Sequence, residues 1–445
     1  MNSYENLKLI YQAALEAVNP EKIIPKKIQL NGHHLIIKQK QGQLSYDLEK
    51  FKNIYLVGDG KATAYMAKAI EKILGERITQ GLISVKYGHS TDLKKIKIIE
   101  AGHPLPDLNG FKAANKTLEI VKQAQKDDLI IALLSGGGSA LWPLPPQYVS
   151  LKDKQDCTNF LLRAGASIDE VNTVRKHLSL IKGGQLATAG FPATILSFLI
   201  SDVVGDKIDL IASGPFVFDP STFKMAKDII KKYDLASKVS KSILDYLNSG
   251  LKKEETNPKK IENQKKYFSE TKNVIIASNL MALKAAKNKA AQLGYHSQIL
   301  SSTLTGDTKE LAKNKIALAK KIILEKKPLA PPWCLLSGGE TTVQVKGHGL
   351  GGRNLEFCLH TVEEIKEFPN FLVASLGTDG TDGPTEAAGA WVDGNSFKQA
   401  KDKGLTLEKF LQENDSYHFF KELGNLIITG PTKTNVMDLR IMIYS

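Results

Sequence analysis

A lysine that directly follows a glycine-rich turn is the first candidate for chemistry in this sequence. Residues 53–74 read NIYLVGDGKATAYMAKAIEKIL, in which a strand-like run ends at Gly58 and a helix-like pattern begins after Lys61. Gly58 and Gly60 enclose the turn. Backbone N–H groups at the start of a helix attract anions, and a lysine there adds a full positive charge. The pattern indicates an anion-binding turn, and a tight turn with a solvated lysine is the alternative.

The turn matches neither of the two common nucleotide-binding motifs. A P-loop has a glycine five residues before its Gly-Lys pair and a serine or threonine after the lysine, where this chain has Tyr55 and Ala62. A dinucleotide-binding turn has a third small residue, where this chain has Thr63. Walker-type and Rossmann-type nucleotide binding are therefore both disfavoured at Lys61.

Glycine, hydroxyl and carboxylate residues also follow several other strand-like runs. Ligands of open α/β sheets bind beyond the carboxyl ends of the strands, so residues at these places can share one site. The residues are Ser135, Gly136, Gly137, Gly138 and Ser139, then Ser337, Gly338, Gly339 and Glu340, and the carboxylates Asp202, Asp206, Asp379 and Asp382. Carboxylates beside glycine-rich loops suit Mg²⁺–phosphate chemistry. Ser139 lacks the closing glycine of a nucleophile elbow, so a serine hydrolase is not indicated.

Two basic stretches complete the candidate residues. Arg175 lies in NTVRKHLSLIKGGQLA, which predicts either an anion site or an exposed basic helical turn. Arg353 and Asn354 stand at the start of a helix-like pattern, behind the glycine-rich run GHGLGG. An arginine after several glycines at a helix start is typical of carboxylate or phosphate recognition, because the glycines allow close backbone approach.

The elements that must position these residues alternate along the chain. The expected strands are NIYLVG, GLISV, KIIEA, LIIALLS, ATILSFLIS, NVIIASN, WCLLSGG, FLVASLG and NLIITG. Helix-period segments such as 62–74 and 355–365 lie between many of them. This alternation predicts α/β domains with largely parallel sheets. Residues 33–48 instead predict a polar β-hairpin, and the first 18 residues an amphipathic helix.

A lysine-rich polar stretch, residues 249–273, predicts a linker or an exposed excursion. A chain of 445 residues is long for one core, so two domains are expected. The expected bounds are residues 1–250 for an N-terminal domain, 251–272 for the linker and 273–445 for a C-terminal domain.

Composition limits the kinds of partner. The formal net charge is 60 − 47 = +13, but aromatic residues make up only 7% and the lysines spread through amphipathic helical stretches. We interpret most of this charge as a lysine-rich surface that favours anionic metabolites, and we expect neither a nucleic-acid nor a membrane partner. Three cysteines without CxxC or Cys/His spacing suit a reducing cytosol. No signal peptide or membrane-length apolar run is evident, so we expect a cytoplasmic protein.

Several stretches in order resemble the glycerate 2-kinases of the MOFRL type. They are VGDGKA, AGHPLPDLNG, LLSGGGSALW, NTVRKHLSLIKGGQLA, SDVVGDKIDLIASGP, SGGETTVQVKGHGLGGRNLE, SLGTDGTDGPTEAAGAWVD and TGPTKTNVMDLRI. The resemblance extends from about residue 5 to residue 443 and weakens in the hairpin and the lysine-rich stretch. One departure is Lys433, where glycine is usual in the family.

The resemblance implies ATP-dependent phosphorylation of D-glycerate to 2-phosphoglycerate, with Mg²⁺. It implies a Rossmann-like N-terminal α/β domain, a C-terminal MOFRL domain and an active site in the interdomain cleft. A monomer or a homodimer is expected, with D-glycerate as the small-molecule substrate.

The resemblance also assigns roles to residues. The lysine and arginine most associated with activity in the family correspond to Lys61 and Arg353, and the aspartate of its SDVVGD stretch corresponds to Asp202. We expect these three to be catalytic, and Arg175 and Asn354 to join Lys61 and Arg353 in binding substrate. The expected nucleotide contacts are Gly58, Gly60, Ser135, Gly136, Gly137, Gly138, Ser139, Ser337, Gly338, Gly339 and Glu340. The expected metal ligands are Asp202, Asp206, Asp379 and Asp382.

Two other functions remain as alternatives. A hydroxypyruvate reductase would need a nicotinamide site, and the sequence has no GxGxxG-type turn with a following acidic residue. A non-catalytic nucleotide- or sugar-binding protein would not need aspartates clustered near glycine loops. An assay with ATP, Mg²⁺ and D-glycerate distinguishes the three.

Overall fold

The computed structural model describes residues 3–39, 41–256 and 265–445, and these form two compact units. The central unit comprises Ile24–Ile200 and Lys207–Ile276, and the terminal unit comprises Met1–Ile23, Ser201–Asp206 and Ala277–Ser445. The change of unit after residue 276 lies close to the expected bound at 273. Residues 1–23, however, were expected with the N-terminal domain and group with the carboxy-terminal part of the chain.

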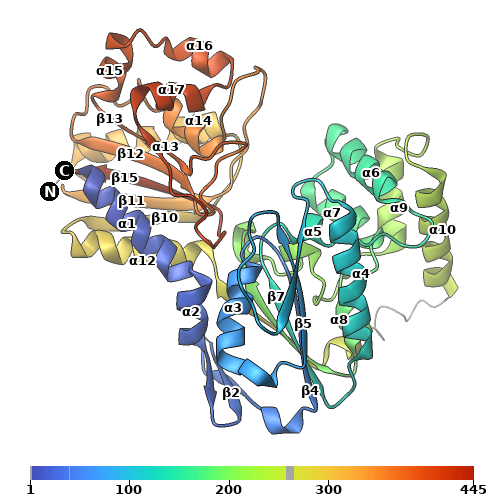
Figure 1. Cartoon of the computed structure of the whole chain (residues 1–445). Helices are drawn as coiled ribbons and strands as arrows, with labels where there is room; N and C mark the ends of the chain where they lie inside the picture. Colours follow the sequence, from blue (N-terminus) through green and yellow to red (C-terminus); the bar gives the residue numbers. More distant parts are fainter. Residues whose placement is uncertain (1–2, 40, 257–264) are drawn as a thin grey trace. The chain divides into compact units, whose positions relative to one another are not determined.

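The central unit is built on a six-stranded sheet with the order β6-β5-β4-β7-β8-β9. Its strands are β4 (Asn53–Asp59), β5 (Gln80–Lys86), β6 (Ile96–Ala101), β7 (Asp128–Leu134), β8 (Thr194–Ile200) and β9 (Thr271–Ala277). The pairs from β6 to β8 are parallel. The predicted parallel α/β sheet is therefore confirmed here. Figure 1 shows α3 (Thr63–Leu74) and α4 (Leu108–Gln123) on opposite faces of this sheet, which explains why β7 is buried along its whole length.

A small antiparallel sheet and a group of helices complete the central unit. The sheet contains β1 (Ile28–Asn31), β2 (His34–Lys38) and β3 (Gln43–Asp47), which confirms the predicted hairpin. The other helices that include residues of this unit are α2 (Pro20–Lys27), α5 (Gly138–Leu141), α6 (Leu151–Arg163), α7 (Ile168–His177), α8 (Gln185–Gly190), α9 (Phe223–Lys232) and α10 (Lys241–Thr256). Capping boxes at Ser150 and Ser167 start α6 and α7. Of the predicted linker, 251–256 end α10, and 257–264 lie outside the described residues.

The terminal unit has a second six-stranded sheet, with the order β10-β11-β15-β12-β13-β14. The strands are β10 (His296–Leu304), β11 (Trp333–Gly339), β12 (Phe371–Gly377), β13 (Gly389–Asp393), β14 (Leu426–Ile427) and β15 (Asp438–Tyr444). Only β10 and β11 pair in parallel; the other four pairs are antiparallel. The expectation of a largely parallel sheet is therefore wrong for this unit. The last strand, β15, enters between β11 and β12 and runs opposite to both.

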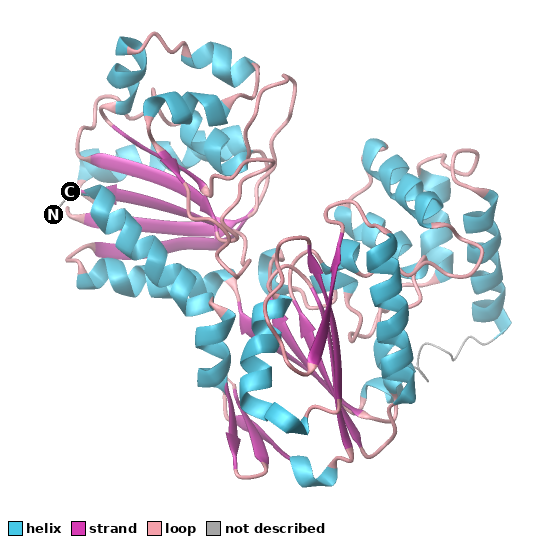
Figure 2. Cartoon of the chain, viewed as in Figure 1, coloured by secondary structure: helices cyan, strands magenta, loops and turns pink. Residues whose placement is uncertain are grey.

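Helices cover both faces of this second sheet (Figure 2). One face carries α1 (Ser3–Val18) and α12 (Asn279–Gln292). The remaining helices of the unit are α13 (Thr308–Glu325), α14 (Arg353–Leu359), α15 (Ser396–Asp402), α16 (Leu407–Gln412) and α17 (Ser416–Leu423). The turn at Lys433, where glycine is usual in the family, keeps a left-handed backbone with φ +70°. No helix among the described residues is long and apolar enough to cross a membrane.

The amphipathic helix α1 explains why the first residues group with the terminal unit. Leu7, Ile10 and Ala14 are completely buried, and their spacing places them on one helical face. The hydroxyl of Tyr11 donates to the carbonyl of Gly377 at 2.7 Å, next to the end of β12. The helix therefore belongs to the core of this unit although it is hundreds of residues away in the sequence.

Ile10→Ala should destabilise the terminal unit by about 2–5 kcal/mol, because it leaves a cavity where α1 packs into the core of that unit. In a Trp142→Phe background the remaining tryptophans, Trp333 and Trp391, both lie in the terminal unit. Fluorescence-detected denaturation then reports on that unit alone. Leu9→Ala, which removes a neighbouring side chain that is 39% exposed, is the matched control and should have a much smaller effect. An unchanged transition in Ile10→Ala would contradict this grouping.

Candidate functional site

The strand order of the central unit brings two glycine-containing loops together. The chain passes from β4 to β5 and β6 on one side and then returns to β7 on the other side of β4. Ligands of open α/β sheets bind at such a reversal, beyond the carboxyl ends of the strands. The two loops are joined directly: the Lys61 N–H donates to the Gly136 carbonyl at 2.8 Å, and the Ala62 N–H to Ser135 Oγ at 3.0 Å.

Two glycines after β7 occupy positions where a side chain would not fit. Gly137 has φ +92°, and a Cβ there would lie 3.0 Å from the His103 ring and 3.4 Å from Lys61 Cγ. A Cβ at Gly138 would lie 2.6 Å from both carboxylate oxygens of Asp59. The side chains of Lys61 and His103 therefore border the same glycine, and Asp59 lies directly behind the next one.

Asp59 and Lys182 form a buried ion pair behind these loops. Lys182 Nζ lies 3.4 Å from Asp59 Oδ2, and the two side chains are 3% and 0% exposed. Lys182 also donates to the Gly138 carbonyl at 3.0 Å. Burial raises the pKa of Asp59 to about 6, and the ammonium of Lys182 opposes that shift. The pair connects the end of β4 to the glycine loop after β7, and each partner depends on the other because an unpaired buried charge is costly.

In the terminal unit, two carboxylates hold Arg353. Its Nε and Nη2 donate to the two oxygens of Asp438 at 2.7 and 3.0 Å, and its Nη1 lies 2.8 Å from Glu340 Oε1. Burial acts to lower the pKa of Arg353, but Asp438 and Glu340 outweigh it and raise the pKa. Asp438 is fully buried, whereas the Glu340 side chain is 44% exposed. One edge of the guanidinium is therefore fixed inside the protein, and Glu340 covers the other on the solvent side.

Asn354 is fixed by a network of hydrogen bonds at the start of α14. Its Nδ2 donates to Asp438 Oδ1 at 3.0 Å and to Asp382 Oδ1 at 3.2 Å, and its Oδ1 accepts from Ser375 Oγ at 2.6 Å. Asp382 Oδ2 accepts from the N–H groups of Asn354 and Leu355 at 3.0 and 2.8 Å. Asp382 thus satisfies two N–H groups of the first helical turn, which otherwise lack partners.

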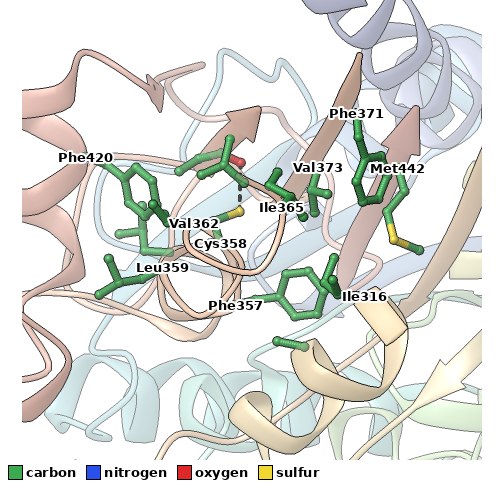
Figure 3. Close-up of a cluster of buried hydrophobic side chains, with 14 of the residues drawn as sticks. Ile316, Phe357, Cys358, Leu359, Val362, Ile365, Phe371, Val373, Phe420 and Met442 are labelled. Carbon is green, nitrogen blue, oxygen red and sulfur yellow. Dashed lines mark hydrogen bonds between the residues drawn. The ribbon is translucent and has the colours of Figure 1, made fainter. Parts of the chain in front are cut away.

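Apolar packing holds α14 in place as well. Figure 3 shows Phe357, Cys358 and Leu359 of this helix within the core cluster of the terminal unit. All three are completely buried, and the thiol of Cys358 donates to the carbonyl of Ala390 at 3.1 Å. A helix fixed in this way presents Arg353 and Asn354 at its first turn in one orientation.

Most of the predicted loop 337–340 lies inside the sheet rather than beyond it. Ser337 to Gly339 form the end of β11 and pair with β15, where Gly339 lies opposite Asp438. Gly338 faces Asn279, because a Cβ there would lie 2.0 Å from Asn279 Oδ1. Glu340 alone follows the strand, and it contacts Arg353. Nucleotide contacts by this stretch stay a prediction.

The four predicted metal ligands all belong to the terminal unit. Asp202 and Asp206 lie in the segment 201–206, and Asp379 Oδ1 accepts from the N–H and hydroxyl of Thr381, both at 3.2 Å. Burial raises the pKa of Asp382 to about 7, although the N–H of Leu355 opposes the shift.

No three of these four aspartates lie close enough together to share one ion. Among the described residues, the only three His, Cys, Asp or Glu side chains close enough for one ion are His33, His34 and Asp47, in the small β1–β3 sheet. Asp382 caps a helix, and Asp379 is engaged in its own turn. The carboxylates supply the oxygen ligands that Mg²⁺ prefers, but other ligands would have to complete its shell.

Arg175 lies on α7 and lines a cavity that Ser139 also lines. Ser139 Oγ lies 2.7 Å from Ser213 Oγ. The structure therefore brings Arg175 close to the loop that follows β7, as it does Lys61.

Sequence reasoning did not select the buried partners Asp59, Lys182 and Asp438 as site residues. Asp59 lies in the glycine-rich turn before Lys61, but its partner, Lys182, is 123 residues away. Asp438 stands two residues before Arg440 in an otherwise apolar strand-like run. Two opposite charges inside such a run are a usable signal, since charged residues are rarely buried without partners.

Known proteins are similar to this chain over nearly its whole length. A family model described as "Domain of unknown function (DUF4147)" matches residues 6–248, and the MOFRL family model matches residues 333–438. A protein from Pyrococcus horikoshii named "Glycerate 2-kinase" is 39% identical over 99% of this chain and 96% of its own length. A protein from Thermotoga maritima named "D-glycerate 2-kinase" is 40% identical over 94% of this chain and 96% of its own length.

A solved structure and a differently named relative add to these matches. The crystal structure of a glycerate kinase from Thermotoga maritima superposes with a TM-score of 0.84 at 36% identity and covers 100% of both chains. A protein from Agrobacterium vitis named "Putative hydroxypyruvate reductase" is 38% identical over 87% of this chain and 86% of its own length.

Lys182→Met should destabilise the central unit by about 3–5 kcal/mol, because it leaves the Asp59 carboxylate buried without its cation. The double variant Asp59→Asn/Lys182→Met should recover part of that loss, since it removes both charges. Denaturation followed by the fluorescence of Trp142, whose ring centroid lies 5.5 Å from Lys182 Nζ, measures the coupling in a background where Trp333 and Trp391 are replaced by phenylalanine. Lys224→Met, at a side chain that is 71% exposed, is the control. Additive effects of the two single substitutions would contradict the pairing.

Proposed function

The chain belongs to the MOFRL-type glycerate 2-kinase family, and from this premise we propose that it phosphorylates D-glycerate to 2-phosphoglycerate with ATP. The observation that carries the proposal is the near full-length identity of 39–40% to two proteins named as glycerate 2-kinases. A kinase reaction requires a nucleotide or similar phosphoryl donor and a small acceptor substrate. We propose ATP and D-glycerate for these, and action in the cytoplasm as a monomer or homodimer without a nucleic-acid or membrane partner.

The residues of the central unit fit a phosphate group. The position next to Gly137 is bordered by Lys61 and His103, and a side chain at that glycine would fill it. Main-chain groups at the sheet reversal and a nearby ammonium are the features that attract phosphate without a P-loop. This fit supports Lys61 as the cation that stabilises charge on the phosphates.

The residues of the terminal unit fit Mg²⁺ only as a partner of a bound phosphate. Mg²⁺ commonly takes one or two carboxylates and completes its shell with phosphate oxygens and water. Asp202, Asp206 and Asp379 have the right chemistry for such a contribution, whereas Asp382 serves α14. When bound, Mg²⁺ would neutralise charge that develops on the transferring phosphoryl group.

The catalytic roles follow from the chemistry of phosphoryl transfer, in which positioned charges matter more than covalent steps. We assign Lys61 to the phosphates and Asp202 to the metal or to the proton of the attacking hydroxyl. Arg353 acts on the phosphoryl group or the substrate carboxylate. Because Asp438 already binds one edge of the guanidinium, we expect substrate to take the place of Glu340. Asp438 is then a positioning residue.

The function is tested with purified protein, ATP, Mg²⁺ and D-glycerate, with nuclear magnetic resonance to identify the phosphorylated carbon. We expect ADP formation only when all three components are present, and phosphate on carbon 2. Lys61→Ala should reduce kcat by about 10²–10³, as for the loss of one preorganised electrostatic donor. Lys72→Ala, at an exposed lysine of α3, the helix that follows Lys61, should retain full activity. Reduction of hydroxypyruvate with NADH or NADPH, without ATP, would instead support the reductase alternative.

Arg353→Lys tests the arginine separately, because lysine keeps the charge but loses the planar fork that spans Asp438 and Glu340. We expect kcat/KM to fall by about 10²–10³ while the fold is retained. A rise in KM for D-glycerate with little change in kcat indicates carboxylate binding, and a fall in kcat indicates action on the phosphoryl group. Arg163→Lys, at an exposed position, is the control. Wild-type kinetics in Arg353→Lys would remove Arg353 from the mechanism.

A further inference from the structure

A small cavity in the central unit lies beside the loop that follows β7. Its volume is about 290 Å³. Its walls come from the segment 104–106, from Ser139 to Pro143 around α5, from α6 and from α7. The lining residues are Pro104, Leu105, Pro106, Ser139, Ala140, Pro143, Leu151, Lys154, Gln155, Thr158, Asn159, Leu162 and Arg175.

The charged residues that line this cavity are two cations, Lys154 on α6 and Arg175 on α7. Both are partly buried. Among the described residues, neither side chain has an ion pair or a hydrogen bond with a carboxylate. Two neighbouring side chains donate to main-chain carbonyls. Gln155 Nε2 donates to Pro106 at 3.0 Å, and Thr158 Oγ1 donates to Lys154 at 2.9 Å. Partly buried cations that share a cavity without an anion are unusual, because such charges are normally paired.

The surroundings of Lys154 disfavour its positive charge. Burial lowers the pKa of Lys154 well below its usual value, and the charges of Arg175 and Lys182 add to this effect. Cys157, on the same helix, is the one group that acts in the opposite direction. The carboxylate of Asp59 is engaged by Lys182. A bound anion would relieve the repulsion between these cations.

We propose that this cavity is an anion-binding subsite in which Lys154 and Arg175 hold a carboxylate or phosphate group, beside Ser139. Arginine offers a bidentate fork, and lysine a compact point charge, to either group. The volume lies just below the roughly 300–1,000 Å³ that is typical of small-molecule pockets. It therefore suits a three-carbon acid better than a whole nucleoside triphosphate. That the acid is D-glycerate rests on the proposed function; the anion subsite itself does not.

Calorimetric titration of the full-length protein with three probes tests the subsite: D-glycerate, inorganic phosphate and a non-hydrolysable ATP analogue. Lys154→Met should weaken binding of D-glycerate and of phosphate about tenfold or more, the effect of losing a charge-assisted contact. Binding of the ATP analogue should not change. Lys152→Met, an exposed lysine on the same helix that pairs with Asp156, is the control and should match the wild type for every probe.

The unfolding temperature of Lys154→Met without ligand is a second measurement. It distinguishes a ligand-binding lysine from a structural one. Because Lys154 has no carboxylate partner in the part of the chain that the structure describes, Lys154→Met should leave the unfolding temperature unchanged or raise it. Loss of a structural contact would lower it. Weakened binding of the ATP analogue alone would assign the subsite to nucleotide phosphate instead of the acid. Unchanged affinity for all three probes would overturn the proposal. If phosphate binds through Lys154 but D-glycerate is not phosphorylated, the proposed function fails and the anion subsite stands.

Discussion

The buried ion pair between Asp59 and Lys182 is the interaction on which the arrangement of the candidate site in the central unit depends. Asp59 ends the first strand of the sheet, and Lys182 comes from the segment after α7. Their charges meet directly behind Gly138, and Lys182 also donates to that glycine's carbonyl. A pair of this kind adds little net stability compared with apolar packing, but removal of one member is costly. Its structural effect is to keep the loops after β4 and β7 in one arrangement.

The terminal unit also contains a buried carboxylate paired with a cation, but in a different geometry. Asp438 is also a fully buried carboxylate, but it binds Arg353 and Asn354 at once and is approached by Arg440 at 3.5 Å. Here the carboxylate orients the side chain of Arg353 itself, whereas in the central unit Asp59 lies behind the backbone of Gly138. Lysine is a flexible point charge and arginine a planar fork, so the arginine benefits more from a fixed partner.

Three cations of the central unit, Lys182, Lys154 and Arg175, differ in their surroundings. Lys182 is neutralised by Asp59 and shapes the loops. Lys154 and Arg175 line a cavity that contains no carboxylate among its lining residues. Among the described residues neither cation has a carboxylate partner, and a bound anion would reduce the free-energy cost of their burial. The same physical rule, that a buried charge requires a partner, thus explains the Asp59–Lys182 pair and underlies the proposed anion subsite.

The sequence by itself determined the α/β class, most of the strands, the hairpin and the glycine-flanked positions of Lys61 and Arg353, because local periodicity and turn residues carry that information. Only the tertiary structure decided that β15 runs antiparallel between β11 and β12, because a strand buried on both faces has the same apolar pattern in either direction. It alone also decided the partners of the charged groups. Lys182 lies 123 residues from Asp59, and Asp438 lies 85 residues from Arg353. Such pairs leave no local pattern in the sequence, since nothing in the neighbouring residues records which distant charge the fold will bring to them.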